Sequence, residues 1–375
     1  MVALVLTTAG NARAATVTIN NATDLTSAST YSNNANPTGA SDYEFNLNTY
    51  TSPGGFTVGG SVQYGSLNDV STQALTITGG EINLINTNGN GISGNSADLV
   101  YIASGSSLTV VGAASNDLAL NVGKTGNIDN AGILNIGTFG LSITTGDNVT
   151  FTGAGTTTLS GSISNGSTTD VLIGNGTNGT LVVTGSGTTN GATVNAGGTL
   201  IYGNATTSAS STTAGAIKLA GGALQLNGTA GATSETMSSL TLSGTSTLDL
   251  TPGSNSVTLS LTSLTTTGGE LVISGWDGSS TTGSTTTAID YTGSFTGTDL
   301  TNITWASGTV IDGVTYGGVT GSEEVNGQII PNLADAIPAA PEPTTAFAAL
   351  CLVGLLIWSN RRQLWDAGRC FSRAE

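Results

Sequence analysis

The side chains of this chain that can do acid–base chemistry are few, and most are carboxylates. A glycosidase needs two such acids converging on one cleft. The candidates are Asp249, Glu270, Asp277, Asp290, Glu323 and Glu324. They are scattered among turn residues, where a solvated acid is the ordinary role. A polysaccharide lyase also needs a basic residue to act on the sugar, and between residues 15 and 343 only Lys124 and Lys218 are available.

Other kinds of active site are excluded or disfavoured. The chain has no His, which excludes Ser-His-Asp triads and His-ligated metals. Gly123-Lys124-Thr125 is similar to the end of a P-loop, but Leu118 stands where the first Gly is needed. The Gly/Asn-rich turn at residues 88–98 lacks the carboxylate density that holds Ca²⁺. We therefore expect no catalytic residue, cofactor or metal, with a polysaccharide lyase or glycosidase on a β-helix scaffold as the alternative.

The amino-acid composition limits the classes of molecule that this chain can bind. Gly accounts for 55 of the 375 residues, and charged residues make up only 8%, against about a quarter in typical proteins. Residues 15–343 carry two Lys against 21 acids. Such a surface repels nucleic acid and anionic lipid but tolerates neutral sugars. Both cysteines, Cys351 and Cys370, lie near the C-terminus, so we expect no disulfide in the main body.

Short runs of alternating apolar and polar residues recur along the chain and are separated by Gly- and Asn-containing turns. Such alternation predicts β-strands, and Gly and Asn supply the positive φ that sharp turns require. Examples are residues 74–77, 81–84, 107–110, 118–122, 181–183, 217–219, 224–226, 240–242, 248–250 and 257–261. A sandwich, a barrel or a parallel β-helix fits an all-β chain of this kind. Regular spacing and similar turns favour a right-handed parallel β-helix with coils of about 20 to 25 residues, Leu, Ile and Val inside and Thr and Asn outside.

Aromatic residues mark the ends of this predicted solenoid. They are enriched in residues 15–65 and 271–335 and sparse between them. Large rings suit the terminal units of a solenoid, which must cover an open apolar end. We predict an N-terminal β cap at 15–65, solenoid repeats at 66–270, a C-terminal β cap at 271–335 and a Pro-rich spacer at 336–343 that joins no sheet.

Two repeated segments carry a family resemblance. Residues 175–200 repeat Asn-Gly-Thr and Gly-Gly-Thr-Leu elements, and residues 216–250 contain Leu-Ala-Gly-Gly-Ala-Leu-Gln-Leu. Both resemble the autotransporter-associated β-strand repeat. The resemblance implies a passenger-type β-helix like those of secreted bacterial adhesins.

The C-terminal stretch predicts a membrane segment. Pro341-Glu342-Pro343 precedes an apolar run, and no charge occurs from 343 to 360, which is 18 residues. A helix of about 20 apolar residues crosses the hydrocarbon core of a membrane. We therefore predict a transmembrane helix at 344–360 and, because Arg361 and Arg362 follow it, a basic cytoplasmic tail at 361–375.

This arrangement resembles the PEP-CTERM sorting signal, in which a Pro-Glu-Pro motif, one apolar helix and an Arg-rich end follow in that order. The resemblance implies export by a bacterium and processing by an exosortase-type transpeptidase at the inner membrane. The sorting residues would be Pro341, Glu342, Pro343, Arg361 and Arg362. The chain departs from the family pattern because it continues to residue 375 after the basic pair.

The N-terminal residues fit the same route. Residues 1–14 have the apolar character of a signal peptide remnant, and Ala12 and Ala14 match the small-x-small rule for signal peptidase, leaving Ala15 as the new N-terminus. We expect an exported, non-catalytic protein, anchored by its C-terminal helix and then placed at the cell surface or in the extracellular matrix. Its role would be structural or adhesive, with exopolysaccharide as a partner and no nucleic acid.

Asn-x-Thr sequons also occur, including Asn175-Gly176-Thr177, Asn204-Ala205-Thr206 and Asn227-Gly228-Thr229. A composition so rich in Asn and Thr produces them by chance. The sequence alone assigns no glycosylation.

Overall fold

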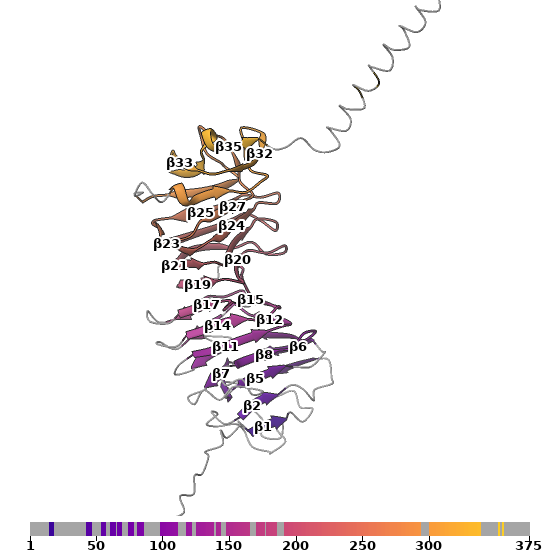
Figure 1. Cartoon of the computed structure of the whole chain (residues 1–375). Coiled ribbons are helices and arrows are strands. Elements are labelled where there is room, and N and C mark those ends of the chain that lie inside the picture. The colour runs from indigo at the N-terminus through magenta and orange to yellow at the C-terminus, as the bar shows by residue number, and fades with distance from the viewer. Residues whose placement is uncertain are drawn as a thin grey trace, which may run out of the picture.

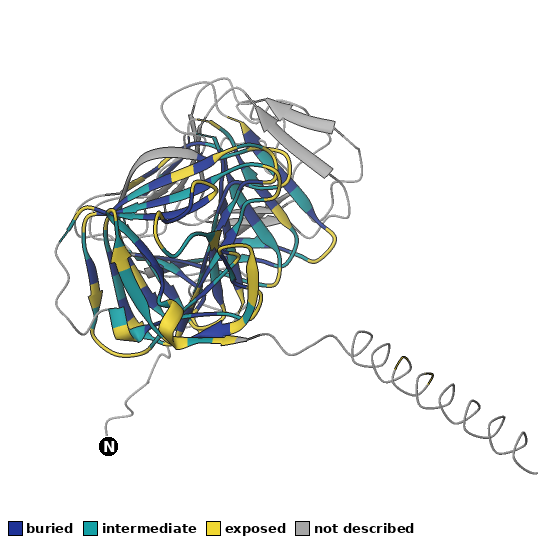
Figure 2. Cartoon of the chain, turned by 90° about the horizontal axis from the view of Figure 1, so that it is seen from above, coloured by how far each residue is buried: buried dark blue, intermediate teal, exposed yellow. Residues whose placement is uncertain are grey.

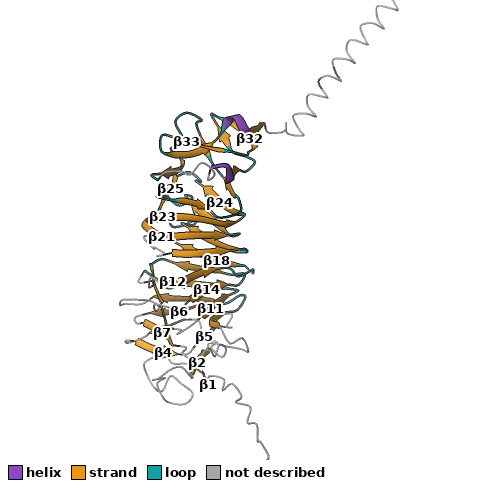
Figure 3. Ribbon diagram, turned by 60° about the vertical axis from the view of Figure 1, so that its left-hand side comes forward, coloured by secondary structure: helices purple, strands orange, loops and turns teal. Residues whose placement is uncertain are grey.

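The computed structural model describes residues 98–338 with gaps, the strands that precede residue 98, and residues 352 and 355. The gaps are 112–117, 122–124, 139, 144–147, 166–169, 177, 186–190 and 294–299. Strands stack along one long axis, as Figures 1 and 3 show. The described strands form two 15-stranded sheets and one 5-stranded sheet, and nearly all pairs are parallel.

The strands lie on three long faces of the rod. The first face contains β1 (Ala15–Thr18), β2 (Tyr43–Asn46), β5 (Ser66–Asp69), β8 (Asp98–Ile102), β11 (Thr125–Asn130), β14 (Asn148–Thr152), β17 (Asp170–Ile173), β19 (Gly191–Asn195) and β26 (Leu264–Thr266). The second face contains β3 (Gly54–Thr57), β6 (Ala74–Thr78), β9 (Ser107–Val111), β12 (Ile133–Ile136), β15 (Thr156–Leu159), β18 (Gly179–Val183), β20 (Gly198–Tyr202), β22 (Ala223–Asn227), β24 (Ser246–Thr251), β27 (Leu271–Ser274) and β30 (Ile303–Trp305).

The third face changes character along the rod. It begins with β4 (Ser61–Tyr64), β7 (Glu81–Ile85), β10 (Leu118–Asn121), β13 (Leu141–Ile143) and β16 (Ile163–Asn165). Further along, β21 (Ser210–Ala220) and β23 (Thr233–Gly244) are long strands that serve both the third and the first face. The first half of β23 pairs with β25 (Val257–Leu261) and its second half with β26. Then β29 (Thr287–Tyr291) pairs with β25.

The register shows coils of unequal length. Thr180 lies beside Thr199, 19 residues further along the chain, whereas Ile82 lies beside Leu118, 36 residues further. Coil length therefore varies more widely than the expected 20 to 25 residues. The prediction of an all-β, parallel solenoid is confirmed.

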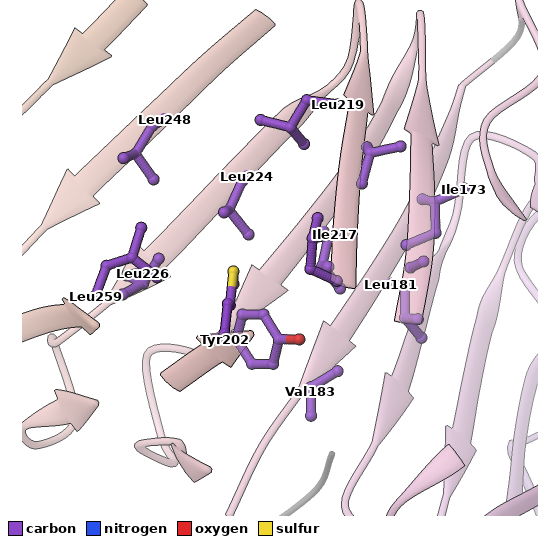
Figure 4. Packing of buried hydrophobic residues seen from close by; sticks show 14 of the residues in the cluster. Ile173, Leu181, Val183, Tyr202, Ile217, Leu219, Leu224, Leu226, Leu248 and Leu259 are labelled. Carbon is purple, nitrogen blue, oxygen red and sulfur yellow. The ribbon is translucent and has the colours of Figure 1, made fainter. Parts of the chain in front are cut away.

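Apolar ladders form the core. Inward residues of the second face follow one another in register: Leu108, Leu134, Thr157, Leu181, Leu200, Leu224, Leu248, Ile273 and Trp305. All are buried. Figure 4 shows part of this packing, and Figure 2 shows buried residues alternating mainly with intermediate ones along the strands. Burying apolar area at about 25 cal/mol per Å² makes such ladders the main source of stability, because the described core has no disulfide.

The single polar rung, Thr157, shows how the core tolerates a hydroxyl group. Its Oγ1 accepts a hydrogen bond of 3.1 Å from the Nδ2 of Asn130, which is itself buried. A buried polar group is costly only when it lacks a partner. Asn130 also accepts a bond from the backbone N–H of Gly132 and so holds the turn between β11 and β12.

Parallel pairing extends past residue 270. β27 pairs with β24, and β30 pairs with β27, both in parallel. β31 (Val310–Ile311) pairs in parallel with the short strand at residues 277–278 and antiparallel with β32 (Val314–Val319), and β33 (Ser322–Val325) and β34 (Gln328–Pro331) form an antiparallel hairpin. Short elements complete this end: β28 (Asp277–Gly278), the 3₁₀ turns η3 (Leu300–Asn302) and η4 (Leu333–Asp335), and β35 (Ala336–Pro338).

Two tryptophans lie where the coils end. The rings of Trp276 and Trp305 meet edge to face with centroids 5.5 Å apart, and both residues are buried. The Trp305 indole donates a 2.8 Å hydrogen bond to Ser322 Oγ. The Trp276 indole N–H is buried without a partner among the described residues, which costs free energy that ring packing must offset.

Part of the predicted spacer belongs to a sheet, which corrects that expectation. Residues 336–338 form β35, which pairs antiparallel with β32. Pro338 is tolerated because β35 lies at the edge of the sheet, where a missing N–H breaks no ladder. Pro341, Glu342 and Pro343 lie outside the described residues.

The predicted terminal segments are almost entirely outside the described residues. Ala12, Ala14, Arg361 and Arg362 are not described, and Ala15 opens β1. Within 344–360 only Leu352 and Leu355 are described, and both are helical and exposed. In the described part of the chain, no helix has the length and apolar character needed to cross a membrane.

Candidate binding surface of the solenoid

The outer side of the second face carries two columns of aligned side chains, which we call the outer columns. Inward and outward side chains alternate along each strand, so every outward position repeats on the next coil, about 4.8 Å away. The first outer column runs Ser107, Ile133, Thr156, Thr180, Thr199, Ala223, Thr247, Val272 and Thr304. Thr156, Thr180 and Thr199 place hydroxyl-bearing side chains on three consecutive coils.

The second outer column lies two residues further along each strand. It runs Thr109, Asn135, Thr158, Val182, Ile201, Gln225, Asp249 and Ser274. Amide and hydroxyl groups bond along it, as where Asn135 Nδ2 donates to Thr109 Oγ1 at 3.2 Å. These bonds hold neighbouring side chains in fixed positions, so the surface is ordered before any ligand arrives.

Asp249 is the charged member of the outer columns. Its carboxylate accepts hydrogen bonds from Gln225 Nε2 at 3.1 Å, Thr251 Oγ1 at 3.1 Å and Ser274 Oγ at 3.0 Å. The donors come from β22, β24 and β27, so this half-buried carboxylate connects three consecutive coils. A carboxylate holding three donors is already satisfied and serves the sheet.

The other predicted acids bond to neutral groups on separate elements. Glu270 accepts from Thr304 Oγ1 at 2.5 Å, and Asp290 accepts from Gln328 Nε2 at 3.0 Å. Asp277 lies exposed on β28, and Glu323 and Glu324 lie on β33. These contacts join no two of the candidate acids. No group of three or more Cys, Asp or Glu side chains in the described ranges is arranged to hold a metal ion.

The basic candidates are also placed apart from the acids. Lys218 is exposed on the first face, in register with Thr193 and Thr241. Its neighbours across the ladder are therefore hydroxyl groups. Lys124 lies outside the described residues.

Two carboxyl groups in distinctive surroundings, those of Asp312 and Glu235, were not among the candidates from the sequence. Asp312 accepts hydrogen bonds from the backbone N–H and the hydroxyl of Ser280, the latter at 2.5 Å. Hydrogen bonds from the Ser280 and Ser279 side chains lower the pKa of Asp312 from its ordinary value. Asp312 and Gly313 form the two-residue turn between β31 and β32, both with positive φ. The Asp-Gly pair is a hairpin signal that could have placed this turn.

Glu235 is the second carboxyl group that was not among the candidates from the sequence. It is fully buried on the inner side of β23, in register with Leu259. Alternation places it inside, because Thr233 and Met237 on either side of it also face inward. A carboxyl in such a position is unusual, and only the alternation pattern signals it.

A shallow cavity of about 210 Å³ lies at the corner between the first and second faces. Its lining comes from three consecutive coils: Gly197, Gly198, Thr199, Gly221, Gly222, Ala223, Thr245, Ser246 and Thr247. Gly198 is required by close packing, since a Cβ at this position would lie 2.0 Å from the Ile173 carbonyl oxygen. The cavity follows from this tight turn.

Comparisons of the chain with known protein families, with curated proteins and with solved structures give no match. A functional conclusion therefore rests on the fold and on the chemistry of its surface.

Proposed function

We propose that this chain is an exported, non-catalytic solenoid of a bacterial cell surface or extracellular matrix, with a structural or adhesive role. The observation that carries the proposal is the pair of outer columns, in which most of the aligned side chains on this long rod bear hydroxyl or amide groups. Its coil is right-handed, as the connections between parallel strands nearly always are. The right-handedness of the coil and the structural or adhesive role are both parts of the proposal, added to the observed parallel solenoid.

The partner we propose is a neutral exopolysaccharide whose hydroxyl groups bond to the outer columns. Sugars offer donors and acceptors at short repeats, and a ladder offers complementary groups on every coil. Each contact is weak, but a polymer that engages several coils at once gains affinity through effective concentration. The low charge of the described faces disfavours nucleic acid as a competitor.

We further propose that a PEP-CTERM signal sorts the protein. β35 ends at Pro338, so Pro341 follows the end of the cap by three residues. That distance is about 10 Å of extended chain. The motif follows the folded cap closely. A cut at the motif by an exosortase-type enzyme would therefore leave the body of the rod intact. The apolar run at 344–360 would hold the chain in the inner membrane until then.

The test is fractionation and intact-mass measurement of the protein from its own host. We expect the mature protein in the matrix fraction, lacking everything after the Pro341-Glu342-Pro343 motif. A Glu342→Ala chain should stay uncut in the membrane fraction, whereas Glu324→Ala, an acid on the cap, should be processed normally. An uncut wild-type chain in the inner membrane would contradict the sorting proposal.

The binding part is tested with matched pairs of substitutions in the full chain. Thr180→Val with Thr199→Val removes two aligned hydroxyls from the outer columns and keeps β-propensity. We expect polysaccharide binding to fall roughly three- to tenfold, as the loss of a few weak hydrogen bonds implies. The control is Thr193→Val with Thr241→Val on the first face. Equal loss in both pairs would show that the second face is not the binding surface.

A further inference from the structure

A sequon lies in an exposed turn after β20. Asn204 is half-exposed, and the three residues after it, Ala205, Thr206 and Thr207, are exposed. The turn is closed by a 2.8 Å hydrogen bond from the Asn204 backbone N–H to the Thr207 carbonyl. An Asn-x-Thr sequence on a surface loop is the acceptor pattern for N-linked sugars.

The hydrogen bonds at Asn204 occupy one end of its side chain only. Its Oδ1 accepts from the Thr206 N–H at 2.8 Å, the Thr206 hydroxyl at 3.0 Å and the Thr207 N–H at 2.7 Å. Its Nδ2 has no acceptor within the described ranges. Three donors on the carbonyl oxygen draw electron density from the amide, which makes its N–H protons easier to lose. The sequon hydroxyl is one of the three donors.

The other sequons whose Asn and Thr are both described lack this combination. Asn148 is the first residue of β14, and its sequon Thr150 is buried within that strand. Asn302 Nδ2 already donates to Thr266 Oγ1 at 3.2 Å. Asn227 is the last residue of β22 and lies in register with Thr251, and its Oδ1 accepts only from the Thr229 N–H. Asn178 directly precedes β18, so its sequon Thr180 is a ladder residue. Strand pairing would hinder an enzyme that must bind the acceptor segment.

We propose that Asn204 is a site of N-linked glycosylation, taking a sugar from a diphosphate-activated donor. In the transfer, the bond between the sugar C1 and the diphosphate oxygen breaks, and a bond from C1 to Asn204 Nδ2 forms. The diphosphate leaves with the electron pair, and Nδ2 gives one proton to a basic group of the transferase. The donor is a sugar nucleotide or a lipid-linked sugar diphosphate, which present the same reacting group.

The position of this turn is compatible with binding at the outer columns. Asn204 follows the end of β20, while Thr199 lies near the start of that strand. A sugar at the turn would therefore occupy a corner of the rod and leave the hydroxyl column open. The modification is distinct from the sorting and binding roles proposed above, and the test does not depend on export.

The test uses the purified, folded full chain with a soluble sequon-specific N-glycosyltransferase and UDP-glucose. We expect intact mass to increase by one hexose and fragment spectra to place it at Asn204. Asn204→Gln should abolish the increment, and Thr206→Val, which removes the hydroxyl and keeps the shape, should lower its rate at least tenfold. Asn227→Gln is the matched control and should behave as wild type. A parallel reaction with a lipid-linked oligosaccharide and its membrane transferase distinguishes the two donor sources.

A heat-denatured chain serves as the second measurement. Unfolding exposes every sequon, so the label should spread to Asn178 and Asn227, which shows that the fold selects Asn204. The proposal is overturned if the folded chain takes no hexose at Asn204 from either donor. It is also overturned if Thr206→Val is labelled as fast as wild type while its circular dichroism is unchanged.

Discussion

Carboxylates in this rod are held by hydroxyl and amide donors. Asp249 takes three such donors from adjacent coils, Glu270 takes a threonine hydroxyl, and Asp290 takes an amide from the hairpin. Neutral donors satisfy a carboxylate without the desolvation cost of a buried ion pair. This explains how a body with so few basic residues accommodates its acids near ladders.

Asp312 offers a test of this idea through pH. Its folded pKa lies below the ordinary value of 3.8, because serine donors favour the charged form. The stabilisation is therefore present above the unfolded pKa and lost as pH falls through the folded one. Asp312→Asn keeps size and tolerates positive φ. We expect wild type to melt higher than this variant near neutral pH and the gap to close in acid.

Melting temperatures from about pH 6 to about pH 2 measure this difference. Ser280→Ala is the matched variant, because it removes the main donor and leaves the carboxylate. Like Asp312→Asn, it should melt below wild type near neutral pH, and this difference in melting temperature should also shrink in acid. Melting curves of wild type and Asp312→Asn that stay equally far apart at every pH would contradict the assignment.

At the scale of the strand, alternation decides what each residue contributes. An inward side chain touches the same kind of residue on the coils before and after it, as Leu224 does between Leu200 and Leu248. An outward side chain meets solvent and its column neighbours. Stability in such a stack is close to a sum of coil terms and nearest-neighbour terms.

We expect Leu224→Ala to cost about 2 to 5 kcal/mol, since it leaves a cavity in a fully buried ladder. Thr247→Ala, an exposed position on the next coil, should change stability by less than about 0.5 kcal/mol. Urea unfolding followed by circular dichroism measures both. A Leu224 variant as stable as the Thr247 variant would mean that this coil does not unfold with the rest.

On the scale of the whole molecule, the ends of the rod matter most. A stack of parallel coils exposes an apolar cross-section and unpaired strand edges wherever it stops. At the C-terminal end, the antiparallel strands β32 to β35 follow β31, which is the last strand with a parallel partner, and buried Trp276 and Trp305 lie near this junction. The cap thus separates the ladder from solvent.

A chain that ends at residue 307 would lack these antiparallel strands. We expect it to keep its β-rich circular dichroism spectrum but to self-associate end to end, because its last coil becomes an open edge. Light scattering coupled to size exclusion measures the mass. A truncated chain that stays monomeric with an unchanged spectrum would show that the cap is dispensable for solubility.

The all-β class and the solenoid could be predicted because their cause is local. Alternation buries every second side chain, and Gly and Asn permit the turns, whatever the distant parts of the chain do. The end of the parallel stack could not be predicted in this way. Aromatic content changes at residue 271, but parallel pairing continues to Ile311, because pairing direction depends on which strand lies alongside.

The candidate surface also has one part that local sequence predicts and another that depends on tertiary structure. Outward Thr and Asn residues could be predicted from the alternation, but their columns could not, because register joins residues 19 to 32 positions apart. The three donors on Asp249 and the contact between Ser280 and Asp312 also come from separate strands or turns. Local pattern determines which face a side chain occupies. Its partners are decided by tertiary packing. The number of residues in a coil varies with the lengths of its loops, and no short-range sequence pattern gives that number.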